Sequence, residues 1–69
     1  MKTIRELRED RGWSQYELAM KIGVHPSTVY QWERGRKMPK IPQFRKLAEV
    51  FGVPMEEIEI LEPEGKAAA

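Results

Sequence analysis

The chain has 69 residues, of which 33% are charged and 41% are hydrophobic, and its formal net charge is +1 at pH 7. This length allows one small domain, and the absence of cysteine excludes disulfides and thiolate metal ligands. No apolar run approaches the roughly 20 residues that a membrane helix needs, and no signal peptide is apparent, so we expect a cytoplasmic protein without metal or cofactor.

The first two helices are predicted from repeated capping signals. Thr3 and Glu6 have the spacing of a capping box, in which each side chain binds a backbone N–H of the first turn. Ser14 and Glu17 repeat that spacing. We therefore expect one helix over residues 3–11 and a second one starting after Ser14, each stopped by a glycine.

Residues 15–34 are interpreted as two short helices joined by a tight turn. Gly23 ends the first of them, because glycine adopts the left-handed conformation without a Cβ penalty. The second should begin around Pro26, which suits the first position of a helix. Val29 and Trp32 give it an apolar stripe. This spacing resembles the helix-turn-helix of DNA-binding proteins, whose second helix enters the major groove.

Two further helices are expected beyond a proline-containing loop. Apolar residues recur at helical spacing over residues 41–51, and Gly52 should end that fourth helix. A short fifth helix is expected over residues 55–61. No stretch alternates between apolar and polar residues, so we expect no sheet. The domain should span residues 1–62, followed by a flexible C-terminal tail over residues 63–69.

Five short helices need a shared core. The two tryptophans could instead be exposed platforms on which nucleobases stack, but their aliphatic neighbours at helical spacing favour the core. The nominated core residues are Ile4, Leu7, Trp13, Leu18, Ala19, Ile22, Val24, Val29, Trp32, Ile41, Phe44, Leu47, Ala48, Phe51, Val53, Ile58 and Leu61.

Charges are sorted along the chain. Residues 34–46 contain six lysines and arginines and no acid, whereas residues 47–69 contain six glutamates and one lysine. Such a basic segment can face a polyanion. A solvated loop followed by a solvated helix is the alternative interpretation. The position of the basic run, directly after the predicted second helix of the motif, favours a binding role.

Over residues 3–61 the sequence resembles the Cro/cI-type, or XRE-like, helix-turn-helix family, which includes the lambdoid phage repressors. The resemblance is carried by the segments IRELRE, SQYELA, IGV, STVYQWERG and KLAEVFGV. It implies an all-α, compact five-helix fold similar to that of the lambda repressor domain, with the helix-turn-helix formed by helices two and three. It also implies binding to double-stranded operator DNA, commonly as a dimer, with helix three (about residues 26–34) in the major groove.

The resemblance also implies which side chains contact DNA. By position, Pro26, Ser27 and Gln31 would read base edges, Thr28, Arg34 and Arg36 would contact phosphates, and Gln15 would contact both. Together with neighbouring polar and basic residues, the candidate DNA-binding set is Gln15, Pro26, Ser27, Thr28, Tyr30, Gln31, Arg34, Arg36, Lys37 and Lys40.

Helical geometry supports part of that set. If the apolar stripe of the third helix faces the core, its outer face carries Ser27, Tyr30, Gln31 and Arg34. Gln31 can pair bidentately with adenine, which contributes roughly 1–3 kcal/mol of discrimination. Ser27 is a weaker and less selective reader. An exposed polar side chain is usually only solvated, so the motif is what favours a binding role here.

Arg8 and Glu33 match an ion pair that, in some family members, ties helix one to the end of helix three. The alternative is that Arg8 belongs to a surface charge network with nearby acids, which would contribute about 0–1 kcal/mol. We prefer the partly buried tie. Its role would be structural.

Several positions depart from the family pattern. Pro26 stands where a polar base-reading side chain is common, and it can offer only apolar contact. His25 takes a capping position usually held by serine or threonine, as an exposed or cap-like imidazole or as a phosphate contact. Lys40 and Pro54 likewise replace small polar caps. These departures affect the expected starts of helices three to five.

The leading functional hypothesis is a sequence-specific DNA-binding transcriptional regulator, specifically a repressor, in a prokaryotic, viral or plasmid-encoded setting. The alternatives are an antitoxin-type regulator that also binds a partner protein and an interaction module that has lost DNA binding. An enzyme is the weakest hypothesis, because no base–nucleophile arrangement is implied. We expect operator DNA as the partner, without membrane or small-molecule effector. A homodimer through Val50, Met55 and Ile60 is a further hypothesis.

Overall fold

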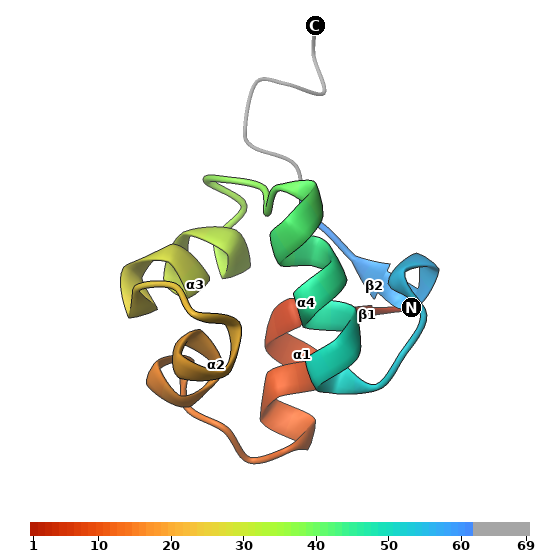
Figure 1. Ribbon diagram of the computed structural model, residues 1–69, viewed down its shortest axis with the longest axis horizontal. Coiled ribbons are helices and arrows are strands. Elements are labelled where there is room, and N and C mark those ends of the chain that lie inside the picture. Colours follow the sequence, from red (N-terminus) through yellow and green to blue (C-terminus); the bar gives the residue numbers. More distant parts are fainter. Residues whose placement is uncertain (62–69) are drawn as a thin grey trace, which may run out of the picture.

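The computed structural model describes residues 1–61, so the tail predicted over residues 63–69 lies outside the described residues. The described elements, in chain order, are β1 (Lys2–Thr3), α1 (Ile4–Asp10), α2 (Gln15–Ile22), α3 (Pro26–Glu33), α4 (Ile41–Phe51), the 3-10 helix η1 (Met55–Glu57) and β2 (Ile58–Glu59). Helices α2 and α3 lie on one side of α1 and α4, and the two strands lie on the other (Figure 1). Within the described part of the chain, no helix has both the length and the apolar content to cross a membrane.

Both predicted capping boxes are confirmed. The Thr3 hydroxyl accepts from the backbone N–H of Glu6 at 3.1 Å, and the Glu6 carboxylate accepts from the N–H of Thr3 at 2.9 Å. Ser14 and Glu17 form the same reciprocal pair at 3.0 and 2.8 Å. These bonds satisfy backbone donors that have no partner within the helix, and they fix where α1 and α2 begin.

The prediction of a fifth helix over residues 55–61 is wrong, and so is the expectation of no sheet. Only the three residues of η1 are helical, and β2 then pairs in parallel with β1, with Ile58 opposite Lys2. Ile58 is buried and Glu59 is exposed, which is the alternation of a strand. Two residues are too few for that alternation to stand out in the sequence. The partner strand is also more than fifty positions away, so no local pattern reports the pairing.

Most of the predicted core is confirmed. Nine apolar side chains, at most 5% exposed, form its centre: Ile4, Leu7, Leu18, Ala19, Val29, Trp32, Leu47, Phe51 and Ile58. Ile41 and Leu61 were wrongly assigned to it, because they are 60% and 37% exposed. Ile41 is the first residue of α4 and lies outside the part of the helix that packs on the core. Leu61 lies beyond the end of β2. Val50 and Ile60, expected outside the core, pack against it.

Trp13 belongs to the edge of this core. Its ring stacks on that of Phe51 with centroids 6.0 Å apart, and the ammonium of Lys21 lies 4.6 Å from its ring centroid. Arg11 donates to the backbone carbonyls of Leu7 and Phe51, which ties the end of α1 to the end of α4. Trp13 is thus partly buried and packed against the core, as predicted, and is not a fully exposed stacking platform.

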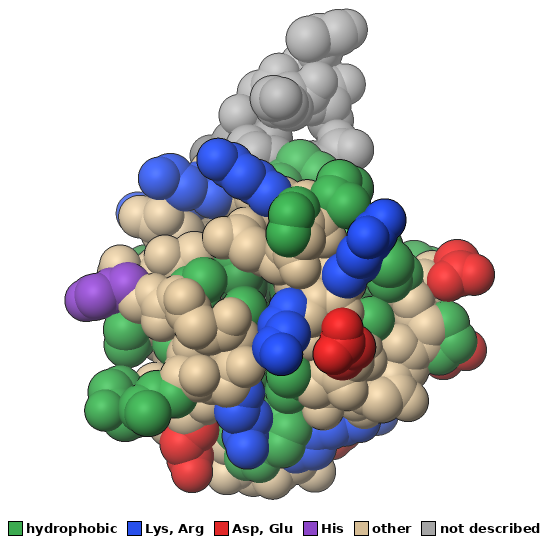
Figure 2. All heavy atoms as spheres, in the orientation of Figure 1, with side chains coloured by type: hydrophobic (Ala, Val, Ile, Leu, Met, Phe, Trp, Pro, Cys, Tyr) green, Lys and Arg blue, Asp and Glu red, His purple; other side chains and the backbone are tan. Residues whose placement is uncertain are grey.

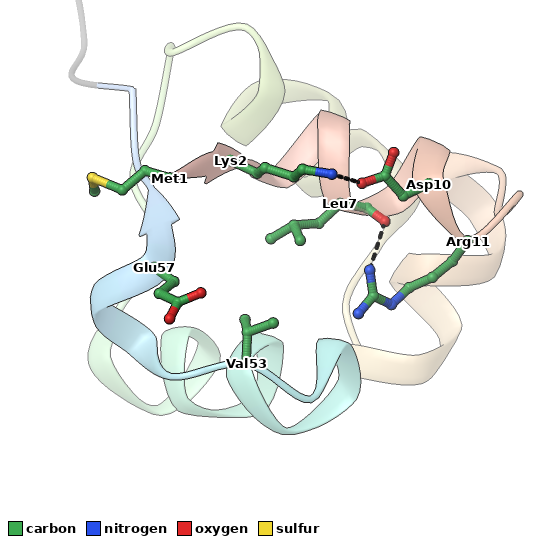
Figure 3. A pocket seen from close by; sticks show the side chains of 7 residues that line it. All are labelled: Met1, Lys2, Leu7, Asp10, Arg11, Val53 and Glu57. Atoms are coloured by element: carbon green, nitrogen blue, oxygen red, sulfur yellow. Dashed lines mark hydrogen bonds and ion pairs between the residues drawn. The ribbon is translucent and has the colours of Figure 1, made fainter.

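A pocket of about 370 Å³ lies beside the Arg11 tie. It is lined by residues of β1, α1, η1 and the segment after α4, and Lys2 forms an ion pair with Asp10 across one side of it (Figure 3). No residue of α2 or α3 lines this pocket. The pocket and the helix-turn-helix therefore occupy different parts of the surface.

Candidate nucleic-acid interface

Helix α3 turns its apolar stripe inward. Val29 has no exposed surface and Trp32 is 3% exposed, so both belong to the core. On the opposite face, Ser27 is exposed, Tyr30 is 40% exposed and Gln31 is half-buried. The helix therefore presents polar side chains outward.

The turn between α2 and α3 is fixed by one glycine. Gly23 has a φ angle of +88°, in the left-handed region, and its N–H donates to the carbonyl of Ala19 at 2.8 Å. Val24 donates to the same carbonyl at 3.0 Å, which closes the end of α2. Ala19 has no exposed surface. Its small side chain lets the two helices pack closely, and they share the most extensive contact between any two described elements.

His25 caps the start of α3. Its Nδ1 accepts from the backbone N–H of Ser27 at 3.1 Å and lies 2.9 Å from the Ser27 hydroxyl oxygen. The imidazole thus replaces the oxygen of the serine or threonine expected at this place. The sequence indicated an exposed or cap-like imidazole or a phosphate contact at His25, but it did not indicate the contact with the Ser27 side chain. The spacing His-x-Ser at a helix start is the signal that could have indicated it.

Arg8 and Glu33 form a bidentate ion pair. The Arg8 Nε and Nη2 donate to the two carboxylate oxygens at 2.7 and 3.0 Å, and the two side chains are 12% and 3% exposed. Arg8 also donates from Nη1 to the carbonyl of Trp13 at 2.8 Å. The hydrogen bond to Glu33 raises the pKa of the Arg8 guanidinium, and burial opposes this shift only in part.

Gln15 is held by the same carboxylate. Its Nε2 donates to Glu33 Oε1 at 3.0 Å, and the residue is half-buried. Glu33 therefore joins α1, the first residue of α2 and the last residue of α3. The DNA contact expected of Gln15 stays a prediction, and the structure adds that its amide nitrogen is already bound to the protein.

The segment after α3 wraps back onto that helix. Gly35 is buried at a φ angle of +71°, and the N–H groups of Arg36 and Lys37 both donate to the carbonyl of Gln31 at 2.9 and 3.4 Å. The guanidinium carbon of Arg34 lies 5.7 Å from the centroid of the Tyr30 ring.

A cationic rim lies beside the outer face of α3. It consists of four exposed side chains, Arg34, Arg36, Lys37 and Lys40. Lysine and arginine side chains gather along the edge where the connection between α3 and α4 runs (Figure 2). Lys40 precedes α4 and makes no side-chain cap; instead its N–H donates to Gln43 Oε1 at 2.8 Å.

The two remaining candidates sit in the first turn of α3. Pro26 is the first residue of the helix, as predicted, and Thr28 donates from its N–H to the carbonyl of His25 at 2.9 Å. Both are half-buried. The structure thus brings Pro26, Ser27, Thr28, Tyr30 and Gln31 onto one helix, with the cationic rim at its end and Gln15 at the start of the neighbouring helix.

Residues 4–58 match the helix-turn-helix protein family. Among curated proteins, the chain is 42% identical over 55 residues to the transcriptional repressor RstR of the cryptic phage CTXphi from Vibrio cholerae. It is 38% identical over 61 residues to an uncharacterized HTH-type transcriptional regulator of Archaeoglobus fulgidus. It is also 35% identical over 68 residues to the putative multi-protein-binding factor 1 of Yarrowia lipolytica.

These matches differ in how much of each relative they cover. They include 80%, 88% and 94% of this chain, respectively, but 50% of the phage repressor, 87% of the archaeal regulator and 45% of the yeast protein. The chain therefore spans about half the length of the phage repressor and of the yeast factor. A comparison with solved structures gave no significant match.

Proposed function

Because this chain belongs to the helix-turn-helix family, which its sequence matches over residues 4–58, we propose that it is a sequence-specific regulator of transcription that binds double-stranded DNA. One observation carries the proposal: α3 buries Val29 and Trp32 and turns a polar face outward beside the cationic rim. We further propose that it acts as a repressor, by occupying an operator. Its role is binding, with no reaction catalysed.

In the proposed complex, α3 lies in the major groove. Gln31 pairs through its amide with adenine N6 and N7, and Ser27 makes a second base contact. Thr28 and the cationic rim contact phosphates on either side of the groove. The backbone N–H groups that open α2 and α3 are further anion-binding groups. Phosphate contacts position the protein and supply most of the affinity, whereas the base contacts supply the sequence preference.

The complex is proposed to contain two protomers. A dimer would place its two α3 helices about 34 Å apart, so that they enter successive major grooves of an operator with twofold symmetry. Sedimentation velocity at micromolar concentration, with and without operator DNA, measures the number of protomers. A dimer on DNA is expected, and a monomer in both states would remove this part of the proposal.

A second candidate function is a regulator that binds a protein as well as DNA. The similarity to the yeast protein named as a multi-protein-binding factor favours it. The acidic residues that follow α4 would suit a basic partner surface, as in the antitoxin-type hypothesis. This function is compatible with the first, because α3 and the acidic segment are different parts of the chain.

Selection from a pool of random duplexes at a stated salt concentration tests the leading proposal. The protein is expected to enrich one short sequence class, and Gln31→Ala should weaken that enrichment at one base pair. A pool that stays random while the folded protein binds every duplex equally would contradict the assignment of sequence-specific binding.

A further inference from the structure

The imidazole of His25 receives two contacts from one residue of α3. The backbone nitrogen of Ser27 lies 3.1 Å from Nδ1, and the hydroxyl oxygen of Ser27 lies 2.9 Å from the same ring nitrogen. A backbone N–H can only donate. Nδ1 therefore acts as the acceptor, and the neutral ring carries its proton on Nε2.

The contact between Nδ1 and the Ser27 hydroxyl then has only one direction. Because Nδ1 carries no proton, the hydroxyl must donate to it. A serine hydroxyl has one proton and two acceptor lone pairs. Its proton is used within the protein, so the oxygen offers only acceptor lone pairs to another molecule. Ser27 is exposed on the outer face of α3, where such a molecule can reach it.

In the major groove, the donors on the base edges are the amino groups of adenine N6 and cytosine N4, whereas guanine and thymine present carbonyl acceptors. An unrestrained serine can face either kind of group, which makes it an unselective reader. We propose that His25 fixes Ser27 as an acceptor, so that Ser27 recognises an amino group of adenine or cytosine. His25 is thus a specificity-determining residue that acts through Ser27. The inference rests on the proposed function, since it requires α3 to enter the groove.

The test begins with the base pair that Ser27 contacts. That pair is the one whose sequence preference disappears in Ser27→Ala during selection from random duplexes. In a duplex of the selected sequence, the base at this pair is then replaced by an analogue without its amino group, namely purine for adenine or 2-pyrimidinone for cytosine. A matched duplex replaces the purine of the same pair by its 7-deaza form, which removes the N7 acceptor instead.

Loss of the amino group is expected to weaken binding by the unmodified protein about 3- to 10-fold, the range of one hydrogen bond. The same duplex should bind Ser27→Ala no more weakly than the natural duplex does. This comparison removes any effect of the analogue on the duplex itself. The 7-deaza duplex should bind the unmodified protein normally.

Two variants of His25 separate the orientation of the hydroxyl from the cap. His25→Gly removes the acceptor and places a residue that is well tolerated at a helix N-cap. The freed hydroxyl should then also tolerate guanine or thymine, and sensitivity to the amino group should fall. His25→Asn supplies an oxygen with two lone pairs, which can accept from both the N–H and the hydroxyl of Ser27. It should restore the dependence on the amino group.

The outcomes that overturn the inference differ from the failure of DNA binding. If loss of the N7 acceptor weakens binding while loss of the amino group does not, Ser27 donates and the inference is wrong, although the regulator assignment stands. Unchanged base preference in Ser27→Ala also overturns it. If no duplex is enriched at all, the proposed function itself fails, and the inference fails with it.

Discussion

Glu33 is the residue at which three helices meet. Its carboxylate accepts from two nitrogens of Arg8 and from the amide of Gln15, and its side chain is 3% exposed. Removing the cation that pairs with a buried carboxylate is strongly destabilising, because it leaves the charge buried without compensation. Because folding raises the pKa of Arg8, the stabilisation from its ion pair with Glu33 is fully present at any pH below the unfolded-state pKa of the arginine. It is lost only when the pH rises through the raised value, which lies far above neutral pH.

We predict that Arg8→Ala lowers the free energy of unfolding by about 3–5 kcal/mol, since it leaves the Glu33 carboxylate buried without its cation. Urea denaturation measures this loss. The matched control is Arg5→Ala, which removes an exposed pair with Glu9 and should cost about 0–1 kcal/mol. Equal small losses from both variants would show that the Arg8–Glu33 pair is only a surface contact.

Gln31→Ala should relax the preference at one base pair by roughly 1–3 kcal/mol and leave the others intact. Arg36→Ala should weaken binding to all duplexes alike, because a phosphate contact carries no sequence information. Titration of the selected duplex and of its single-pair variants measures both. Equal losses on every duplex from the glutamine variant would refute its role as a base reader.

The orientations and contacts of individual side chains in the candidate site could be predicted from the sequence to different degrees. The outward side of α3 followed from the three-residue spacing of Val29 and Trp32, which helical geometry converts directly into an inward stripe. The contact of Glu33 with Gln15 could not be read from the sequence, because it depends on how α2 crosses α3. The His25–Ser27 contact was also not predicted, although the two residues are only two positions apart at a helix start.

At the scale of elements, the turn that joins α2 to α3 sets how α3 is presented. Gly23 is in the left-handed region, and a Cβ added there would meet no atom within 4 Å. Glycine is therefore needed at position 23 because of the backbone conformation, and not because a side chain would lack space.

We predict that Gly23→Ala lowers the free energy of unfolding by about 1–2 kcal/mol, the cost of the left-handed conformation for a residue with a Cβ. Gly23→Asn should cost less, because asparagine tolerates this conformation better. Thermal or urea unfolding of the three proteins gives the order. Stabilisation by alanine would mean that the turn does not adopt this conformation in solution.

Elements with local signals were predicted and those without them were not. Capping boxes and glycine stops lie within a few residues of the helix ends that they define, so the sequence located α1 and α2 well. The segment 55–61 depends instead on a partner at the other end of the described chain. Its parallel pairing with β1 prevails over the weak helical pattern, which explains the wrong fifth helix.

For the whole molecule, a net charge of +1 conceals a strongly uneven distribution of charge. The cationic rim follows α3 directly, whereas six glutamates lie in residues 47–69, later in the sequence. Affinity for DNA should thus depend on the rim and not on the net charge.

We predict that the logarithm of the DNA affinity falls linearly with the logarithm of the salt concentration. Four phosphate contacts per protomer give a slope of about −3.6, roughly doubled for a dimer. Fluorescence anisotropy across several salt concentrations measures the slope. Lys37→Ala should make it shallower by about 1 unit per protomer. Affinity independent of salt would contradict the role of the rim.

NMR amide chemical-shift mapping on addition of the selected duplex shows whether the outer face of α3 meets DNA. The largest changes are expected in α3, at the start of α2 and over residues 34–37, with little change around the pocket that Lys2 and Glu57 line. The opposite pattern, with the pocket side perturbed and α3 unchanged, would show that α3 is not the DNA-binding surface.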